Sequence, residues 1–204
     1  MQRIGKRISG RWFTRVVYPL IPWRGGFALR FHPLPVRLSG LKTMSDHYTV
    51  YPRTLTFLLN GGDVLLIKRS SEAHLFPGMY NGVGGHVERG EDVLSSARRE
   101  VHEETGLDVP DLSLRCLLHV DEGPDRPGVL LFVFVGQAER RDVTASGEGV
   151  LHWIPLSRIH ELNLLPDPPP LLARILTPTA GEAPIFARST IPAGGGDWEM
   201  QFVL

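Results

Sequence analysis

The sequence predicts one layered domain of the α/β or α+β class, preceded by a basic N-terminal extension. The chain has 204 residues, which corresponds to about one domain plus an extension. Strand-like segments outnumber helix-like segments and alternate with them, as in layered folds. Hydrophobic residues make up 42% and charged residues 22% of the chain, which is typical of globular proteins. No apolar run approaches about 18 residues, so we expect no membrane-spanning helix.

The N-terminal extension differs in charge from the rest of the chain. Residues 1–45 hold nine basic residues and no acidic one, and the remainder holds 13 basic and 22 acidic residues. Four interpretations compete: a nucleic-acid-binding arm, a transit-type presequence, a secretory signal, and translation from upstream of a start at Met44. The secretory signal fits poorly because the apolar stretch 16–23 contains two prolines. We expect residues 1–44 to be loosely packed and residues 45–204 to form the domain.

The first predicted elements form a hairpin. Residues 48–60 are rich in β-branched and aromatic side chains, the segment 60–63 reads NGGD, and residues 64–69 return as a strand. Residues 70–84 contain glycine and proline and are predicted to be a loop. Beyond it we expect a helix over 92–105, strands over 112–120, 129–138 and 151–155, short helices over 157–163 and 169–176, and a final hairpin formed by 184–191 and 198–204 across a turn at 193–196.

The chain contains a single cysteine, Cys116, and therefore cannot form an internal disulfide. This usage fits a reduced compartment, and we expect the protein to be cytoplasmic.

The helix predicted over 92–105 carries three glutamates on one face. Glu100, Glu103 and Glu104 stand at positions i, i+3 and i+4, within an arc of about 100°. Three stacked carboxylates repel one another unless a cation binds there. Oxygen ligands favour Mg²⁺ or Mn²⁺, which usually complete their shells with water and substrate phosphates. The spacing indicates a metal-assisted phosphate site, and a solvated acidic face is the alternative.

The segment 85–107, GHVERGEDVLSSARREVHEETGL, resembles the box of the Nudix hydrolases. That box reads glycine, five residues, glutamate, seven residues, arginine-glutamate, an aliphatic residue, any residue, two glutamates, any residue, glycine and an aliphatic residue. The chain matches every fixed position: Gly85, Glu91, Arg99, Glu100, Val101, Glu103, Glu104, Gly106 and Leu107. The resemblance implies an α/β/α sandwich around a mixed β-sheet, with the box as loop–helix–loop.

The resemblance also implies residue roles. Nudix enzymes use divalent ions to cleave a nucleoside diphosphate linked to another group, so we expect Mg²⁺, or alternatively Mn²⁺. Glu100 and Glu104 would be the principal metal ligands, and Glu103 a further ligand or the base; which of Glu100 and Glu103 is the base stays open. Arg99 would orient these glutamates, and Glu91 would hold the loop to the helix.

Three residues outside the helix complete the expected reaction site. The resemblance implies that the carbonyl of Gly84 contributes to one metal shell. Many family members place a further carboxylate before a late strand, and Glu148 suits that role as ligand or base. Lys68, at the end of a predicted strand, would add positive charge for the phosphates.

The residues around the box bear on the substrate. The run MYNGVGGHVERGE resembles the MutT-type enzymes that hydrolyse oxidised purine nucleotides such as 8-oxo-dGTP. In that group an asparagine before the glycines reads the base, and Asn81 matches it, with Tyr80 in the preceding aromatic position. Asp167 matches the first of two purine-binding aspartates in some animal members. Leu165, however, replaces the tryptophan expected before it.

Three functions follow as hypotheses. The leading one is a magnesium-dependent pyrophosphohydrolase that cleaves an oxidised purine nucleoside triphosphate to monophosphate and pyrophosphate. The alternatives are a pyrophosphatase for ADP-ribose or another nucleotide conjugate, and a regulatory module that binds a nucleotide without cleaving it. The expected partner is a small nucleotide, since nothing beyond the basic extension points to nucleic acid.

Overall fold

The computed structural model describes residues 47–73, 76–144, 147–176, 183–190 and 198–203. All of them belong to one compact unit, Lys42–Leu204. The expectations for residues 1–44 and for the turn at 193–196 fall outside the described residues. Within the described residues, no helix combines the length and the apolar character needed to cross a bilayer.

A mixed β-sheet forms the centre of the fold. Its strands follow the order β3-β2-β1-β5-β4-β7-β8, and β6 pairs with β2. The pairs β1–β5 and β4–β7 are parallel, and the other pairs are antiparallel. The strands are β1 (Val50–Asn60), β2 (Asp63–Arg69), β3 (Tyr80–Asn81), β4 (Leu112–Asp121), β5 (Gly128–Gln137), β6 (Gly149–Pro155), β7 (Ile185–Thr190) and β8 (Glu199–Val203).

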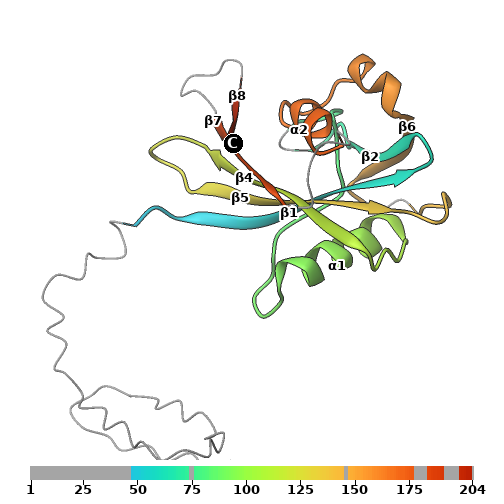
Figure 1. Cartoon of the computed structure of the whole chain (residues 1–204), viewed down its shortest axis with the longest axis horizontal. Helices are drawn as coiled ribbons and strands as arrows, with labels where there is room; N and C mark the ends of the chain where they lie inside the picture. The colour runs from blue at the N-terminus through green and yellow to red at the C-terminus, as the bar shows by residue number, and fades with distance from the viewer. Residues whose placement is uncertain (1–46, 74–75, 145–146, 177–182, 191–197, 204) are drawn as a thin grey trace, which may run out of the picture. The chain divides into compact units, whose positions relative to one another are not determined.

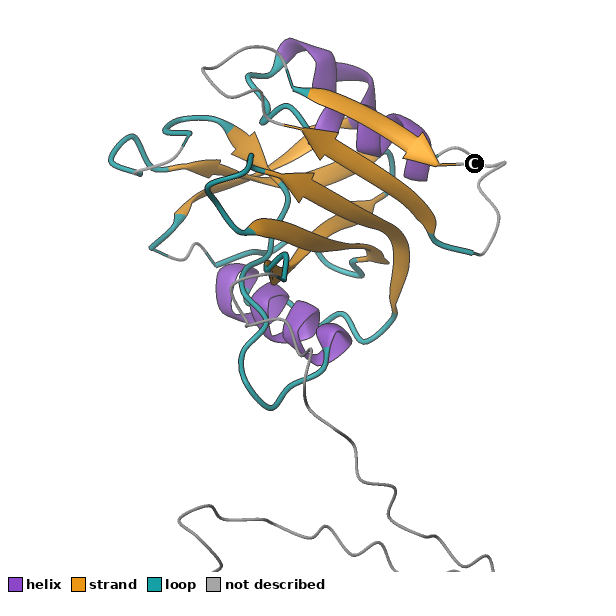
Figure 2. Cartoon of the chain, turned by 90° about the vertical axis from the view of Figure 1, so that its left-hand side faces the viewer, coloured by secondary structure: helices purple, strands orange, loops and turns teal. Residues whose placement is uncertain are grey.

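Helices cover the two faces of this sheet (Figure 1). Helix α1 (Val93–Thr105) lies on one face, while α2 (Pro168–Ile175) and the 3₁₀ helix η2 (Leu156–Glu161) lie on the other (Figure 2). A core cluster fills each interface: one includes Val101 and Leu65, and the other includes Leu171 and Leu66. Because successive residues of a strand point to opposite faces, the run of leucines in β2 serves both clusters. The expected α/β/α sandwich is confirmed.

Most predicted elements agree with the structure to within two residues. Residue Asn60 pairs with Asp63, so Gly61 and Gly62 form the predicted two-residue turn, with Gly61 at a φ of +65°. The pairing of β7 with β8 is antiparallel, as expected. The predicted loop over 70–84 also contains β3, a strand of two residues that is too short for an alternating pattern. The short helix expected over 157–163 is a 3₁₀ helix.

Backbone pairing places the glycine-rich loop beside β1. The Thr54 amide donates to the Gly85 carbonyl at 2.9 Å, and Val83 and Thr56 exchange both backbone hydrogen bonds. The loop therefore runs along the strand before the chain enters α1. This arrangement fixes the glutamates of α1 relative to the sheet.

Candidate active site

Local sequence defines both ends of α1. The Asp92 side chain accepts hydrogen bonds from the amides of Leu94 and Ser95, at 2.9 and 3.0 Å, and so caps the first turn. At the other end Gly106 adopts a left-handed conformation with φ of +71° and donates to the His102 carbonyl. The helix predicted over 92–105 spans Val93–Thr105, so its first boundary differs by one residue and its last is confirmed.

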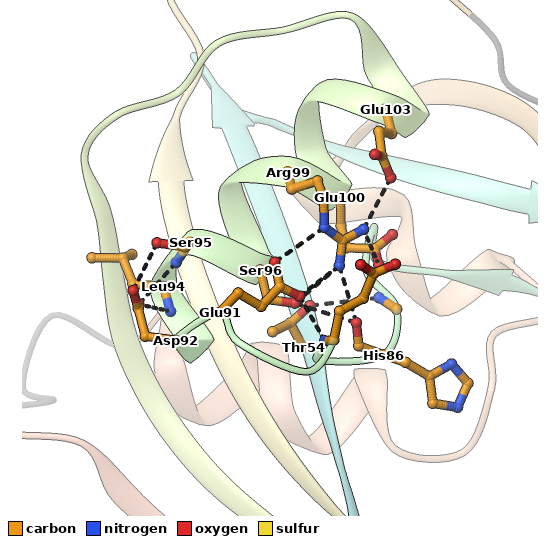
Figure 3. A network of polar contacts seen from close by, with 12 residues as sticks. Thr54, His86, Glu91, Asp92, Leu94, Ser95, Ser96, Arg99, Glu100 and Glu103 are labelled. Carbon is orange, nitrogen blue, oxygen red and sulfur yellow. Dashed lines mark hydrogen bonds and ion pairs between the residues drawn. The ribbon is translucent and has the colours of Figure 1, made fainter. Parts of the chain in front are cut away.

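Arg99 stands at the centre of a polar network on α1 (Figure 3). Its guanidinium binds the Glu91 carboxylate through two nitrogens, at 2.8 and 3.2 Å. It also donates to Glu100 at 2.9 Å, to Glu103 at 3.0 Å and to the His86 carbonyl at 3.1 Å. These bonds join the loop to the helix and orient two of the three glutamates. The arginine hydrogen bonds hold the pKa of Glu91 at about 2.

Glycines allow the loop to pass close to neighbouring groups. A Cβ atom on Gly85 would overlap the Glu100 carboxylate, and one on Gly84 would overlap the Thr54 carbonyl. Gly84 also has a φ of +151°, which L side chains rarely adopt. Its amide donates to Glu104 at 3.1 Å. The loop can therefore lie against the carboxylates only where side chains are missing.

Glu104 is a buried carboxylate with a second carboxylate beside it. The residue is only 4% exposed, and its side chain shares a hydrogen bond with that of Glu148. Burial, then this hydrogen bond and the nearby charge of Glu148, raise the pKa of Glu104 to about 8. Burial also raises the pKa of Glu100, against the effect of Arg99. Two carboxylates can lie this close together only if they share a proton or if a cation binds between them.

A cavity of about 760 Å³ opens beside these carboxylates. Its volume falls within the range of ligand pockets. Several residues expected at the reaction site or the substrate site line it together: Asn81, Gly84, Glu100, Glu104, Glu148, Leu165 and Asp167. The fold thus brings these seven residues to one cavity from β3, the glycine-rich loop, α1 and the loops before β6 and α2.

Five other residues singled out from the sequence do not line the cavity. Glu91 and Arg99 belong to the loop–helix network outside the cavity lining. The Glu103 side chain is 57% exposed and forms an ion pair with Arg99. Lys68 and Tyr80 contact each other, with the ammonium 5.6 Å from the ring centroid. Because alternate strand residues face opposite sides, Ile67 and Asn81 point toward the cavity while Lys68 and Tyr80 point away.

The residues expected to contact the base have distinct environments. The Asn81 side-chain oxygen is buried without a hydrogen-bond partner among the described residues, so it offers a free acceptor. Asp167 is 8% exposed and accepts a hydrogen bond from the Ser189 hydroxyl at 2.8 Å. Burial raises the pKa of Asp167 to about 6. Although Asp167 directly precedes α2, its side chain makes no capping bond.

Arg53 and Trp198 are among the cavity residues that the sequence analysis did not single out. Arg53 on β1 lines the cavity, and burial followed by the charge of Arg69 lowers its pKa. The sequence does contain a signal that Arg53 points inward, because Arg53 alternates with Leu55 and Phe57, which are buried. Trp198, just before β8, also lines the cavity. Its alternation with Met200 and Phe202 is a sequence signal for an inward-facing residue, but not for a cavity.

The donor set of the cavity fits a hard divalent cation. Among the described residues, no three His, Cys, Asp or Glu side chains already surround one point closely enough to enclose an ion. Glu104 and Glu148 nevertheless share a position that suits a cation in place of the proton, and Glu100 lies in the same cavity wall. All three offer only oxygen atoms, the ligands that Mg²⁺ prefers.

Comparisons with known proteins agree on the family. The family model described as the NUDIX domain matches residues 51–175. The oxidized purine nucleoside triphosphate hydrolase of Mus musculus is 33% identical over 102 residues, covering 44% of this chain and 58% of the mouse protein. The m7GpppN-mRNA hydrolase NUDT17 of Xenopus laevis is 46% identical over 50 residues, covering 24% and 17%. The chain therefore spans less than two thirds of the length of these relatives.

Among solved structures, a MutT protein from Bacillus halodurans superposes with a TM-score of 0.65. Its sequence is 19% identical, and the match covers 75% of this chain and 97% of that protein. At this identity the likeness establishes the fold alone.

Proposed function

The chain belongs to the Nudix family, and we propose that it is a divalent-metal-dependent pyrophosphohydrolase acting on a nucleotide. The observation that carries the proposal is the convergence of Glu100, Glu104 and Glu148 on one ligand-sized cavity. In this reaction water attacks a phosphorus atom of the pyrophosphate link, the bridging P–O bond breaks, and two phosphate products leave. The cation, which we propose to be Mg²⁺, would neutralise charge on the phosphate oxygens and acidify the attacking water.

The chain's own residues support the chemistry in separate ways. Glu100, Glu104 and Glu148 line the cavity and would supply the oxygen ligands, and either Glu148 or Glu100 would accept the proton of the attacking water. We propose that Arg99 and Glu91 act by positioning, since they fix the loop against α1 without lining the cavity. Arg53 brings positive charge to the same wall and suits contact with a phosphate.

The proposed substrate is an oxidised purine nucleoside triphosphate, cleaved to monophosphate and pyrophosphate. Two observations support it. Asn81 presents an unpartnered acceptor in the cavity wall, and Asp167 lies nearby with a pKa of about 6, so it can donate or accept near neutral pH. The similarity to the mouse oxidized purine nucleoside triphosphate hydrolase favours the same class.

A nucleotide conjugate remains the second candidate. The similarity to the m7GpppN-mRNA hydrolase favours it, because that protein's name describes a capped substrate. We therefore propose to offer the full chain, with Mg²⁺, a panel of canonical and oxidised nucleoside triphosphates, ADP-ribose, NADH and dinucleoside polyphosphates. Products would be identified by chromatography.

The panel separates the candidates. Selective release of monophosphate from oxidised purine triphosphates supports the leading proposal. Preference for a conjugate retains the site and replaces the substrate. Binding without turnover of any compound contradicts the enzymatic proposal and favours the regulatory module.

A further inference from the structure

The β7–β8 strand pair lies beyond the segment that matches the family model, yet it contributes to the cavity. The match ends at residue 175, and β7 begins at Ile185. Ser189 on β7 holds the Asp167 carboxylate through a buried hydrogen bond. Trp198, at the entrance to β8, lines the cavity directly. Part of the ligand-facing surface therefore comes from a segment outside the residues that match the family model.

The Trp198 indole belongs to an aromatic pair in the cavity wall. Its ring meets that of Phe76 edge-on, with centroids 5.8 Å apart and planes at 71°. Edge-to-face contact is a favoured geometry for two aromatic rings. Trp198 also packs against the core cluster that includes Leu171, which restricts its movement. The two rings thus form an aromatic surface in the cavity wall, and these contacts fix its position.

Phe76 reaches this position at a conformational cost. Its φ is +53°, in the left-handed region that bulky side chains avoid. It is the only non-glycine residue with positive φ among those described. Such backbone strain persists where surrounding contacts enforce it, and it concentrates at ligand-binding sites. Since Phe76 itself lines the cavity, the strain places a second ring beside Trp198.

We propose that Trp198 is a specificity-determining residue that stacks on the nucleobase of the ligand. The inference rests on the proposed function for the identity of the ligand as a nucleotide. The three glutamates suit a metal ion and Arg53 suits a phosphate, and none of them supplies an apolar aromatic face for a base. An indole that lines the same cavity supplies that surface, whereas the aliphatic Leu165, which also lines it, cannot stack in the same way. Purines, with two fused rings, should benefit more than pyrimidines.

The test is a thermodynamic cycle in which the indole is removed from the protein and the base is removed from the ligand. Binding of GMP and of ribose 5-phosphate to the full-length protein and to Trp198→Leu would be measured by calorimetry; neither compound contains a phosphoanhydride bond, so no turnover occurs. Stacking on one base corresponds to about a 5- to 150-fold change in affinity. We expect Trp198→Leu to weaken GMP by that factor and to leave ribose 5-phosphate within about twofold. Trp198→Phe should retain most of the GMP affinity.

Two controls separate stacking from a loss of structure. Trp153→Phe removes an indole that lies on β6 and outside the cavity wall, and it should not alter GMP binding. In the wild-type protein GMP should quench tryptophan fluorescence, and Trp198→Phe should abolish that quenching.

The outcomes distinguish this inference from the function on which it rests. Additive effects of removing the base and the indole, or no quenching by GMP, would overturn the role of Trp198 even if the protein hydrolyses nucleotides. If the protein hydrolyses none of the panel but the cycle is non-additive, the proposed function fails while the base-stacking role holds.

Discussion

Glu104 has an environment unlike that of an ordinary helix carboxylate. Its neighbours on the helix surface are exposed or held by Arg99, whereas Glu104 is buried and shares a hydrogen bond with Glu148. A buried carboxylate is costly when it is charged and unpaired. The proposed function explains why the fold retains it: a cation can replace the shared proton.

Substitution Glu104→Gln tests this explanation. The amide keeps the shape but cannot neutralise a cation, so metal-dependent turnover should fall by at least about 100-fold. Metal-free protein should melt at the same or a higher temperature at pH 8, because a buried charge has been removed. Glu161→Gln, which alters an exposed partner of Arg158, is the matched control and should change neither quantity.

Turnover of Glu103→Gln should be compared with that of Glu104→Gln, since Glu103 binds Arg99 and does not line the cavity. Full turnover in both Glu103→Gln and Glu104→Gln would remove the proposed site.

The raised pKa of Glu104 predicts a pH dependence of stability. A carboxyl whose pKa is higher in the folded state binds more protons folded than unfolded, so stability falls as pH rises between the two values. With a folded pKa of about 8 and an ordinary value of 4.5 when unfolded, this loss should develop between about pH 4.5 and 8 in metal-free protein. Urea unfolding with a chelator measures the slope, which Glu104→Gln should reduce and added Mg²⁺ should oppose. An identical slope in wild type and variant contradicts the assignment.

At the scale of elements, the glycine-rich loop and α1 act as one unit. The loop pairs with β1, crosses the Glu100 carboxylate at Gly85, and is tied to the helix by Glu91 and Arg99. Each part therefore supplies hydrogen-bond partners of the other.

Substitution Gly85→Ala should therefore disturb the reaction more than the fold. The added methyl group would displace the Glu100 carboxylate, and a displacement of about 1 Å can lower turnover by about 100-fold. We expect a loss of about 1–3 kcal/mol in unfolding free energy from the overpacking. Steady-state kinetics and urea unfolding measure the two effects. Gly62→Ala, at a turn where a Cβ meets nothing within 4 Å, is the control, and equal losses in both variants would refute the argument.

At the scale of the whole molecule, the described residues form a unit with its own core clusters. Removal of residues 1–43 should thus leave melting temperature and turnover nearly unchanged. Thermal melts and the nucleotide panel on the shortened chain check this expectation. A large loss of either property would show that the basic extension supports the domain.

Much of the fold was predictable because its signals are local. The NGGD turn, the Asp92 and Gly106 caps of α1 and the alternating strands each depend on neighbouring residues. The two-residue strand β3 was not predicted, because it forms by pairing with β2 and its own sequence carries no strand pattern. The 3₁₀ form of η2 likewise left no separate signature in the sequence.

The sequence alone determined the family, the helix with its three glutamates and the kind of cation they suit, since residues one turn apart share a helix face wherever that helix lies. Only the tertiary structure decided which carboxylates meet. Glu148 reaches Glu104 from a distant loop, while Glu103, beside Glu104 in the chain, turns to Arg99 and solvent. It also brought Arg53 and Trp198 to one cavity from opposite ends of the domain. Contacts between segments far apart in the chain depend on how the sheet is ordered, and local patterns do not encode that order.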